Sequence, residues 1–342
     1  MSSHTEAFEW ACAAFVGLVL CTTPVSADDL ICLRQPNSDA VMSIPATIDD
    51  FTGRFITYHT SSGSQQASTS RVEGIRHEFS ENFKRGQRLF ESGNYEAAKA
   101  EWQLDLKKEP KRWVQREIRS WLVRAAWRQE HWAVAGQQFL AIVAEDPETI
   151  HWPIAPLLWT PGMIRDADRT IARDWLQDDR SVARLLAGSL LLKDKEPALR
   201  ESAVRVLTSL VRDTSPQVSG LAKAQLWRNR FDQPISDSEV ASWQGHLNYL
   251  PKDLRGGPQY LLGAAYLRRG EYDRAAAEFL WVPLMYPQHE PTAARASLEA
   301  GEALMRAARQ DEALKTLEEA AANFGWSQAG RDAKSRVAEL KR

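Results

Sequence analysis

From Glu78 onward, hydrophobic residues recur at the three- and four-residue spacing of amphipathic helices. Residues 28–76 follow a different pattern, in which β-branched and aromatic residues alternate with polar ones, as in Arg54–Thr60. Clusters of Asp, Ser and Gly separate these runs, which is typical of short strands joined by tight turns. The chain is therefore predicted to be mainly α, with a small N-terminal β-rich module of about three to five strands.

A pattern of glycine, alanine, aromatic residues and proline recurs in the helical part. Its clearest copy contains Leu262, Gly263, Tyr266, Gly270, Tyr272, Ala275, Phe279 and Pro287. Their order and spacing resemble the tetratricopeptide repeat (TPR), in which two antiparallel helices form one unit. The resemblance implies an α-solenoid of TPR-like helical hairpins whose concave groove binds a peptide or protein. The whole chain resembles secreted TPR proteins of bacteria such as planctomycetes.

Each position of this copy has a physical reason. Gly263 would let the two helices approach closely near Ala275, where a Cβ would hold them apart. Gly270 would occupy a turn that needs a positive φ. The rings of Tyr266, Tyr272 and Phe279 would fill the space between the helices, and Pro287 would end the second helix.

Other copies keep the register. An earlier copy has Gly86, Leu89, Gly93, Tyr95, Ala98, Trp102 and Pro110, and the next has Trp132, Ala135, Phe139 and Pro147. Ala98 and Ala135 are 37 residues apart, while Ala275 and Ala313 are 38 apart. The usual period is about 34 residues. Each unit is therefore expected to carry three or four extra residues, about the length of one helical turn.

The repeats suggest a division of the chain. TPR-like repeats are expected at residues 77–147 and 251–342, with degenerate helical hairpins at 148–250. The alternative is a break between two shorter arrays, hinged in the 150s. Arg255–Pro258 is glycine-rich and is expected to be a linker.

The N-terminus has the form of a secretory signal peptide. Residues 11–21 are apolar or small, and Val25-Ser26-Ala27 is typical of a cleavage site. Residues 1–27 are thus predicted to be a signal peptide, which places the protein in the periplasm or cell envelope. The first nine residues contain Glu6 and Glu9 but no Lys or Arg, so the alternative is a buried helix in a cytosolic protein. The apolar run is shorter than the ~20 residues that cross a membrane.

Charge and motifs offer no sign of catalysis. The formal net charge is −2 and would be zero without Glu6 and Glu9, which gives no basis for binding nucleic acid. The seven histidines include no metal-binding spacing, and no phosphate loop or nucleophile elbow is present. Cys32 would be the one cysteine after cleavage and is expected to be buried. We expect no cofactor, no metal and no enzyme activity.

One stretch is a candidate binding surface. Residues 107–128 hold eight basic residues and two acidic ones, with tryptophans between them. On a helix, a core stripe would contain Val114, Ile118, Trp121, Leu122 and Ala125. A second stripe would contain Glu117, Ser120, Arg124, Trp127 and Arg128. In a TPR array this second stripe would face the groove, where Arg could bind carboxylates. The alternative is a solvated basic face beside core tryptophans.

Three functions are considered from these features. The first is a non-enzymatic scaffold of the cell envelope that binds a peptide or protein in the groove. The second is a cell-wall polymer or glycan-binding accessory of an envelope enzyme, in which His151, Trp152 and Trp159 would stack on sugars. Cytosolic nucleic-acid binding through the basic stretch is the least favoured.

Overall fold

The computed structural model describes residues 29–162 and 164–342, so the predicted signal peptide lies outside the described residues. The structure is 64% helical, with 14 α-helices and one sheet in the described residues. Its contacts divide the chain into two compact units. The first unit extends to Trp121 and includes Ile142–Ile150; the second comprises Leu122–Ala141 and His151–Arg342. The domain limits expected from the sequence remain predictions.

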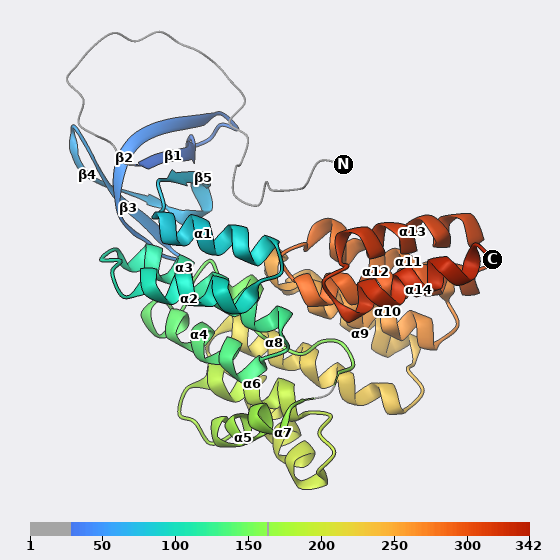
Figure 1. Ribbon diagram of the computed structural model, residues 1–342. Helices are drawn as coiled ribbons and strands as arrows, with labels where there is room; N and C mark the ends of the chain where they lie inside the picture. Colours follow the sequence, from blue (N-terminus) through green and yellow to red (C-terminus); the bar gives the residue numbers. More distant parts are fainter. Residues whose placement is uncertain (1–28, 163) are drawn as a thin grey trace. The chain divides into compact units, whose positions relative to one another are not determined.

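The first unit contains a five-stranded antiparallel sheet in the order β4-β3-β2-β1-β5 (Figure 1). The strands are β1 (Asp29–Arg34), β2 (Val41–Phe51), β3 (Phe55–Thr60), β4 (Gly63–Ser68) and β5 (Val72–His77). Ile31, Ile48 and Ile56 are fully buried, and Ile48 lies between the polar residues Thr47 and Asp49. The predicted β-rich beginning is confirmed, and Cys32 is buried on β1 as expected.

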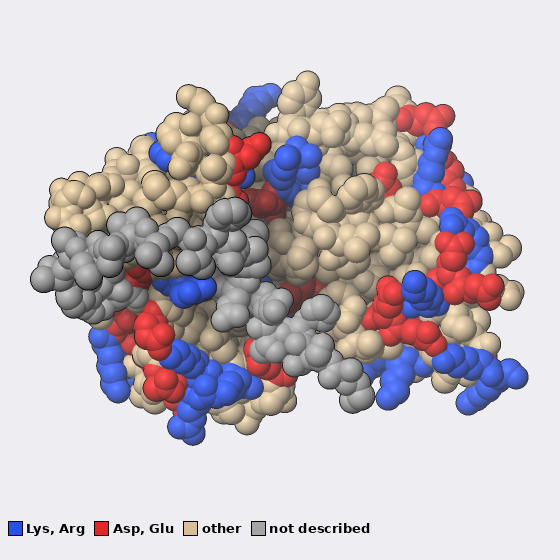
Figure 2. Space-filling view, turned by 90° about the horizontal axis from the view of Figure 1, so that it is seen from above, with Lys and Arg blue, Asp and Glu red and all other residues tan. Residues whose placement is uncertain are grey.

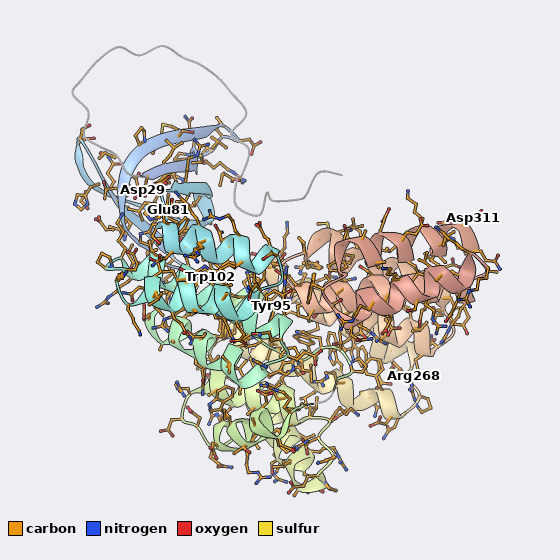
Figure 3. All side chains as sticks on the ribbon, in the orientation of Figure 1. Asp29, Glu81, Tyr95, Trp102, Arg268 and Asp311 are labelled. Carbon is orange, nitrogen blue, oxygen red and sulfur yellow. The ribbon has the colours of Figure 1, made fainter. Side chains whose placement is uncertain are left out.

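Two helices of the first unit, α1 (Glu81–Glu91) and α2 (Tyr95–Leu106), form a hairpin. Trp102 points from α2 toward α1 (Figure 3), where its Nε1 donates a hydrogen bond to the carbonyl oxygen of Phe83 at 3.2 Å. A Cβ on Gly86 would overlap the Trp102 indole. The glycine therefore allows a large ring to fill the hairpin. Two helices, α3 (Arg112–Arg128) and α4 (Trp132–Glu145), contribute residues to both units.

The second unit continues as consecutive helices. They are α5 (Asp166–Trp175), α6 (Ser181–Leu191), α7 (Pro197–Leu210), α8 (Pro216–Trp227), α9 (Asp237–Tyr249), α10 (Gly256–Arg268), α11 (Tyr272–Met285), α12 (Glu290–Arg306), α13 (Gln310–Asn323) and α14 (Gln328–Leu340). From α10 to α14, each helix packs on the next (Figure 1). In addition α10 contacts α12, and α12 contacts α14, so the first helices of successive pairs lie side by side.

The predicted glycine contacts recur in this part. A Cβ on Gly263 would lie 2.7 Å from Phe279, and one on Gly301 would lie 2.6 Å from Leu317. Both pairs are 16 residues apart, as are Gly86 and Trp102. Close approach at Gly263 is thus confirmed, although the side chain that meets it is Phe279 and not Ala275. Ala275 is itself fully buried.

Four turns between helices contain a left-handed residue: α1–α2, α3–α4, α10–α11 and α12–α13. Gly93 and Gly270 have φ angles of 80° and 78°, as the repeat pattern predicts. The equivalent turns place Glu130 and Ala308 at φ 56° and 60°. In this conformation the Cβ of a non-glycine residue comes too close to a backbone carbonyl oxygen, a steric strain that glycine avoids.

Ala308→Gly is therefore expected to stabilise the second unit by about 1 kcal/mol, because relief of strain outweighs the added freedom of the unfolded chain. Ala308 is exposed, so no packing is lost. Chemical denaturation measures the change. Ala307→Gly is the matched control, since Ala307 has a negative φ, and this substitution should destabilise the unit. An Ala308→Gly protein less stable than wild type would contradict the prediction.

The expected linker at Arg255–Pro258 is wrong. Gly256, Gly257 and Pro258 form the buried first turn of α10. A Cβ on Gly257 would overlap the indole of Trp159, so these glycines provide space for packed aromatic residues rather than flexibility.

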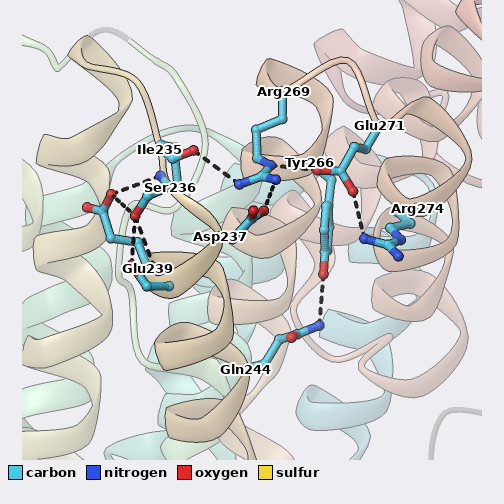
Figure 4. A network of polar contacts seen from close by, with 10 residues as sticks. Ile235, Ser236, Asp237, Glu239, Gln244, Tyr266, Arg269, Glu271 and Arg274 are labelled. Atoms are coloured by element: carbon cyan, nitrogen blue, oxygen red, sulfur yellow. Dashed lines mark hydrogen bonds and ion pairs between the residues drawn. The ribbon is translucent and has the colours of Figure 1, made fainter.

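A polar network holds α9 against the α10–α11 turn (Figure 4). Arg269 donates to the carbonyl of Ile235 at 3.2 Å and pairs with Asp237 and Glu271. The Tyr266 hydroxyl accepts a hydrogen bond from Gln244 of α9 at 2.9 Å. Tyr266 is buried as expected, whereas Tyr272 is only half-buried and fills less of the interhelical space than predicted.

Candidate functional site

The predicted second stripe of α3 is largely used for internal packing. Glu117, Ser120 and Trp127 are buried. Glu117 accepts a hydrogen bond from Trp121 Nε1 at 3.0 Å. These three side chains are not presented to solvent as the walls of an open groove would be.

The two arginines of the stripe bind a carboxylate of the same unit. Arg124 Nη1 lies 3.2 Å from Glu290 Oε1, and Arg128 Nε lies 2.7 Å from Glu290 Oε2. The Arg128 guanidinium also lies 4.5 Å from the ring centroid of Trp326. Arginine does bind a carboxylate here, as the sequence suggests, but the carboxylate belongs to Glu290 of α12 and not to a ligand.

The tryptophans considered for sugar stacking are also buried. Trp152 packs edge-on against Phe139, with ring centroids 5.4 Å apart. Trp159 is 5% exposed and covers Gly257. Neither indole presents the exposed ring face on which a sugar would stack at the protein surface, and the glycan-binding alternative stays a prediction.

A cavity of about 890 Å³ lies within the second unit. It is bounded by the loop before α5, by α5 and α6, by the short 3₁₀ helix η3 (Arg228–Asp232) and by α10. Its apolar lining comes from Leu158, Trp159, Pro161, Ile164, Leu190, Phe231, Leu261 and Ala264. This volume is within the range of small-molecule sites in proteins.

The charged lining of this cavity is more basic than acidic. Its cationic residues are Arg165, Arg169, Lys193, Lys195 and Arg228, and its acidic residues are Glu130, Asp166 and Asp194. Several of them are paired: Arg169 Nε lies 2.7 Å from Asp194, and Lys193 Nζ lies 2.5 Å from Asp232. Arg165 forms a two-pronged pair with Asp168, at 2.7 and 3.1 Å.

Arg228 differs from the other cations of the cavity. Its side chain is buried, with the residue 6% exposed, and its Nη1 donates to the Ser189 carbonyl and to Gln225 Oε1, both at 2.7 Å. Within residues 29–162 and 164–342, no carboxylate forms an ion pair with it. Burial lowers the pKa of Arg228 to about 10, which still leaves the guanidinium charged at neutral pH.

Neutral polar groups fix Arg228 and the adjacent loop. Ser189 Oγ accepts a hydrogen bond from the Leu158 amide at 2.8 Å, and Gln225 Nε2 donates to the Leu158 carbonyl at 3.3 Å. Tyr260 lines the same cavity, and burial raises the pKa of its hydroxyl, so it stays protonated. A buried hydrogen-bond network thus fixes the shape of the cavity. The charge of Arg228 in this network is not paired with a carboxylate of the described residues.

Exposed apolar side chains gather on α11. Trp281, Leu284 and Met285 are 50%, 73% and 54% exposed. The spacing of three and four residues places them on one face of the helix. The opposite face holds Ala275, Phe279 and Val282, which are buried in the unit. Three large apolar side chains thus lie together on the exposed face of α11.

His289 is a buried histidine at the start of α12. Its Nε2 donates to the Asp253 carbonyl at 2.9 Å, and burial lowers its pKa from 6.5 to about 4. The unfolded chain takes up a proton below about pH 6.5, whereas the folded chain does so only near pH 4. The stability that His289 contributes is therefore complete above pH 6.5 and is lost as the pH falls toward 4.

The second unit is thus expected to lose about 3 kcal/mol through His289 between pH 7 and pH 4. Urea unfolding of wild type and His289→Gln at both pH values isolates this contribution. Gln removes the titration and keeps a side-chain donor. The variant should lose less stability than wild type over this range; an equal loss would contradict the assignment.

Charge and metal chemistry add no further site. Figure 2 shows basic and acidic side chains interleaved on one face, without a large patch of either sign. In the described part of the chain, no group of three or more His, Cys, Asp or Glu side chains could hold a metal ion. No described helix combines the length and the apolar character needed to cross a membrane.

No protein-family model and no curated protein matches the chain. Among solved structures, it is similar to a tetratricopeptide repeat protein from Parabacteroides merdae ATCC 43184, with 15% sequence identity and a TM-score of 0.34, over 77% of this chain and 98% of the other.

Proposed function

We propose that this protein is a non-enzymatic interaction scaffold of the cell envelope that binds a protein partner through a short TPR-like solenoid. The observation that carries the proposal is the recurrent hairpin of α10–α11 and α12–α13, each with a helix glycine beneath a side chain 16 residues later. Repeats of this kind stack into extended surfaces, which serve binding in many proteins.

The partner-binding surface is assigned to α11 rather than to the first helices of the repeats. In α10, ten of thirteen residues are buried, which leaves little of that helix free to line a groove. By contrast, Trp281, Leu284 and Met285 are directed to solvent on α11. Tryptophan is enriched among the residues that dominate binding energy in protein interfaces, and methionine is enriched in interface cores.

Affinity capture from an envelope extract tests this proposal. Wild-type protein should retain a partner that the double variant Trp281→Glu, Leu284→Glu loses. Lys315→Glu, at an exposed position of α13, is the control and should retain the partner. Equal retention by all three proteins, or capture of nothing above background, would count against the proposal.

Export is part of the same proposal. It is supported by the apolar run at residues 11–21 and by Val25-Ser26-Ala27. N-terminal sequencing and cell fractionation should find a chain that begins near Asp28 outside the cytoplasm. Soluble cytosolic protein that retains Met1 would contradict export.

A further inference from the structure

We propose that the cavity of the second unit binds a small organic acid, whose carboxylate pairs with Arg228 and whose apolar body contacts Trp159, Phe231 and Leu261. This site is separate from the α11 surface and does not depend on partner binding there.

The first support is the charge of Arg228. A buried cation is costly to remove from water unless an opposite charge or several hydrogen bonds compensate it. Nη1 makes two hydrogen bonds to neutral acceptors, while Nε and Nη2 make none to the described residues. Since Arg228 lines the cavity, these nitrogens can donate to a ligand there. A guanidinium binds a carboxylate or a phosphate through two parallel hydrogen bonds, and the apolar walls of this cavity favour the organic acid.

The second support is the rigidity of the site. Ser189 and Gln225, the two residues that accept hydrogen bonds from Arg228, also bind Leu158 in the loop beside the cavity through Ser189 Oγ and Gln225 Nε2. Arg228 is therefore already positioned before a ligand binds, so its side chain loses less conformational entropy on binding.

The third support is the composition of the walls. Aromatic and aliphatic side chains line much of the cavity, so a hydrated inorganic anion would leave them without contact. Lys195 stands among the lining residues and has no ion pair among the described residues. A basic lining attracts anions to the cavity, and the buried Arg228 selects the charged head group.

The test compares a carboxylate with its neutral isostere. We expect 4-phenylbutyrate to bind the purified full chain, and 4-phenylbutanamide to bind about tenfold more weakly or not at all, by isothermal titration calorimetry. Equal affinity for acid and amide, or no binding of the acid, would overturn the proposal. Binding only of a peptide that carries phenylalanine at its C-terminus would also overturn it, because the ligand would then be a chain end.

Variants locate the binding within the cavity. Arg228→Gln should reduce 4-phenylbutyrate affinity about tenfold and leave the weak amide binding unchanged, while Arg228→Lys should retain part of the preference for the acid. Lys195→Gln is the control and should lower affinity less than about threefold, with a loss that disappears at high salt. Circular dichroism checks folding. Should Arg228→Gln fold poorly, the wild-type comparison and Arg228→Lys still decide the proposal. Unchanged acid affinity in a folded Arg228→Gln protein would overturn it.

Discussion

Gly263→Leu is expected to destabilise the second unit by about 3 kcal/mol or more. A Cβ alone would lie 2.7 Å from Cδ1 of Phe279, whose ring is fully buried and cannot move into solvent. Overpacking a filled interior costs about 1–3 kcal/mol, and leucine adds three carbons beyond the Cβ. The helix propensity gained over glycine, about 1 kcal/mol, is too small to offset this.

Hydrogen exchange read by mass spectrometry measures where the stability is lost. Protection should fall in α10–α13 and should persist around Tyr95 in the first unit. Gly245→Ala is the matched control, because Gly245 lies within helix α9 and a Cβ there would meet nothing within 4 Å. That control should gain up to about 1 kcal/mol. Wild-type stability in Gly263→Leu would disprove the close contact between these helices.

Trp102→Ala is expected to destabilise the first unit by about 3–5 kcal/mol. The indole is fully buried between α1 and α2, and its removal leaves a cavity beside Gly86, which has no side chain to fill it. It also leaves the Phe83 carbonyl without the bond from Nε1.

Trp102→Phe separates these two contributions, because it restores part of the ring volume without the donor. We expect it to lose less than half as much stability as Trp102→Ala in urea unfolding. Hydrogen exchange in Trp102→Ala should increase in α1 and α2 first. A loss below 1 kcal/mol in Trp102→Ala would contradict the packing of this hairpin.

The local features of the fold could be predicted from the sequence because they depend on nearby residues. The alternation in Arg54–Thr60 predicts a strand, and β3 forms there. Gly270 has the positive φ expected of a turn glycine, and α11 ends before Pro287. In the turn at Ala308, the left-handed geometry persists without glycine, so a search for glycine alone misses that copy.

The candidate site could not be predicted because its contacts join distant residues. The basic stretch on α3 suggests a ligand surface, but Glu290 lies 162 residues beyond Arg128 and neutralises it. Arg228 has an acidic residue four positions later, Asp232, which on an α-helix would be a natural partner. The segment is instead a 3₁₀ helix, and Asp232 pairs with Lys193. This geometry leaves Arg228 without a carboxylate among the described residues.

Site-specific photo-crosslinking in living cells tests the proposed scaffold most directly. A benzophenone amino acid at Leu284, the most exposed residue of the α11 cluster, should give a discrete crosslinked adduct with one partner protein. The same probe at Lys315 of α13 should give none. An absence of adducts at Trp281, Leu284 and Met285, or the same adducts at Lys315, would contradict partner binding through α11.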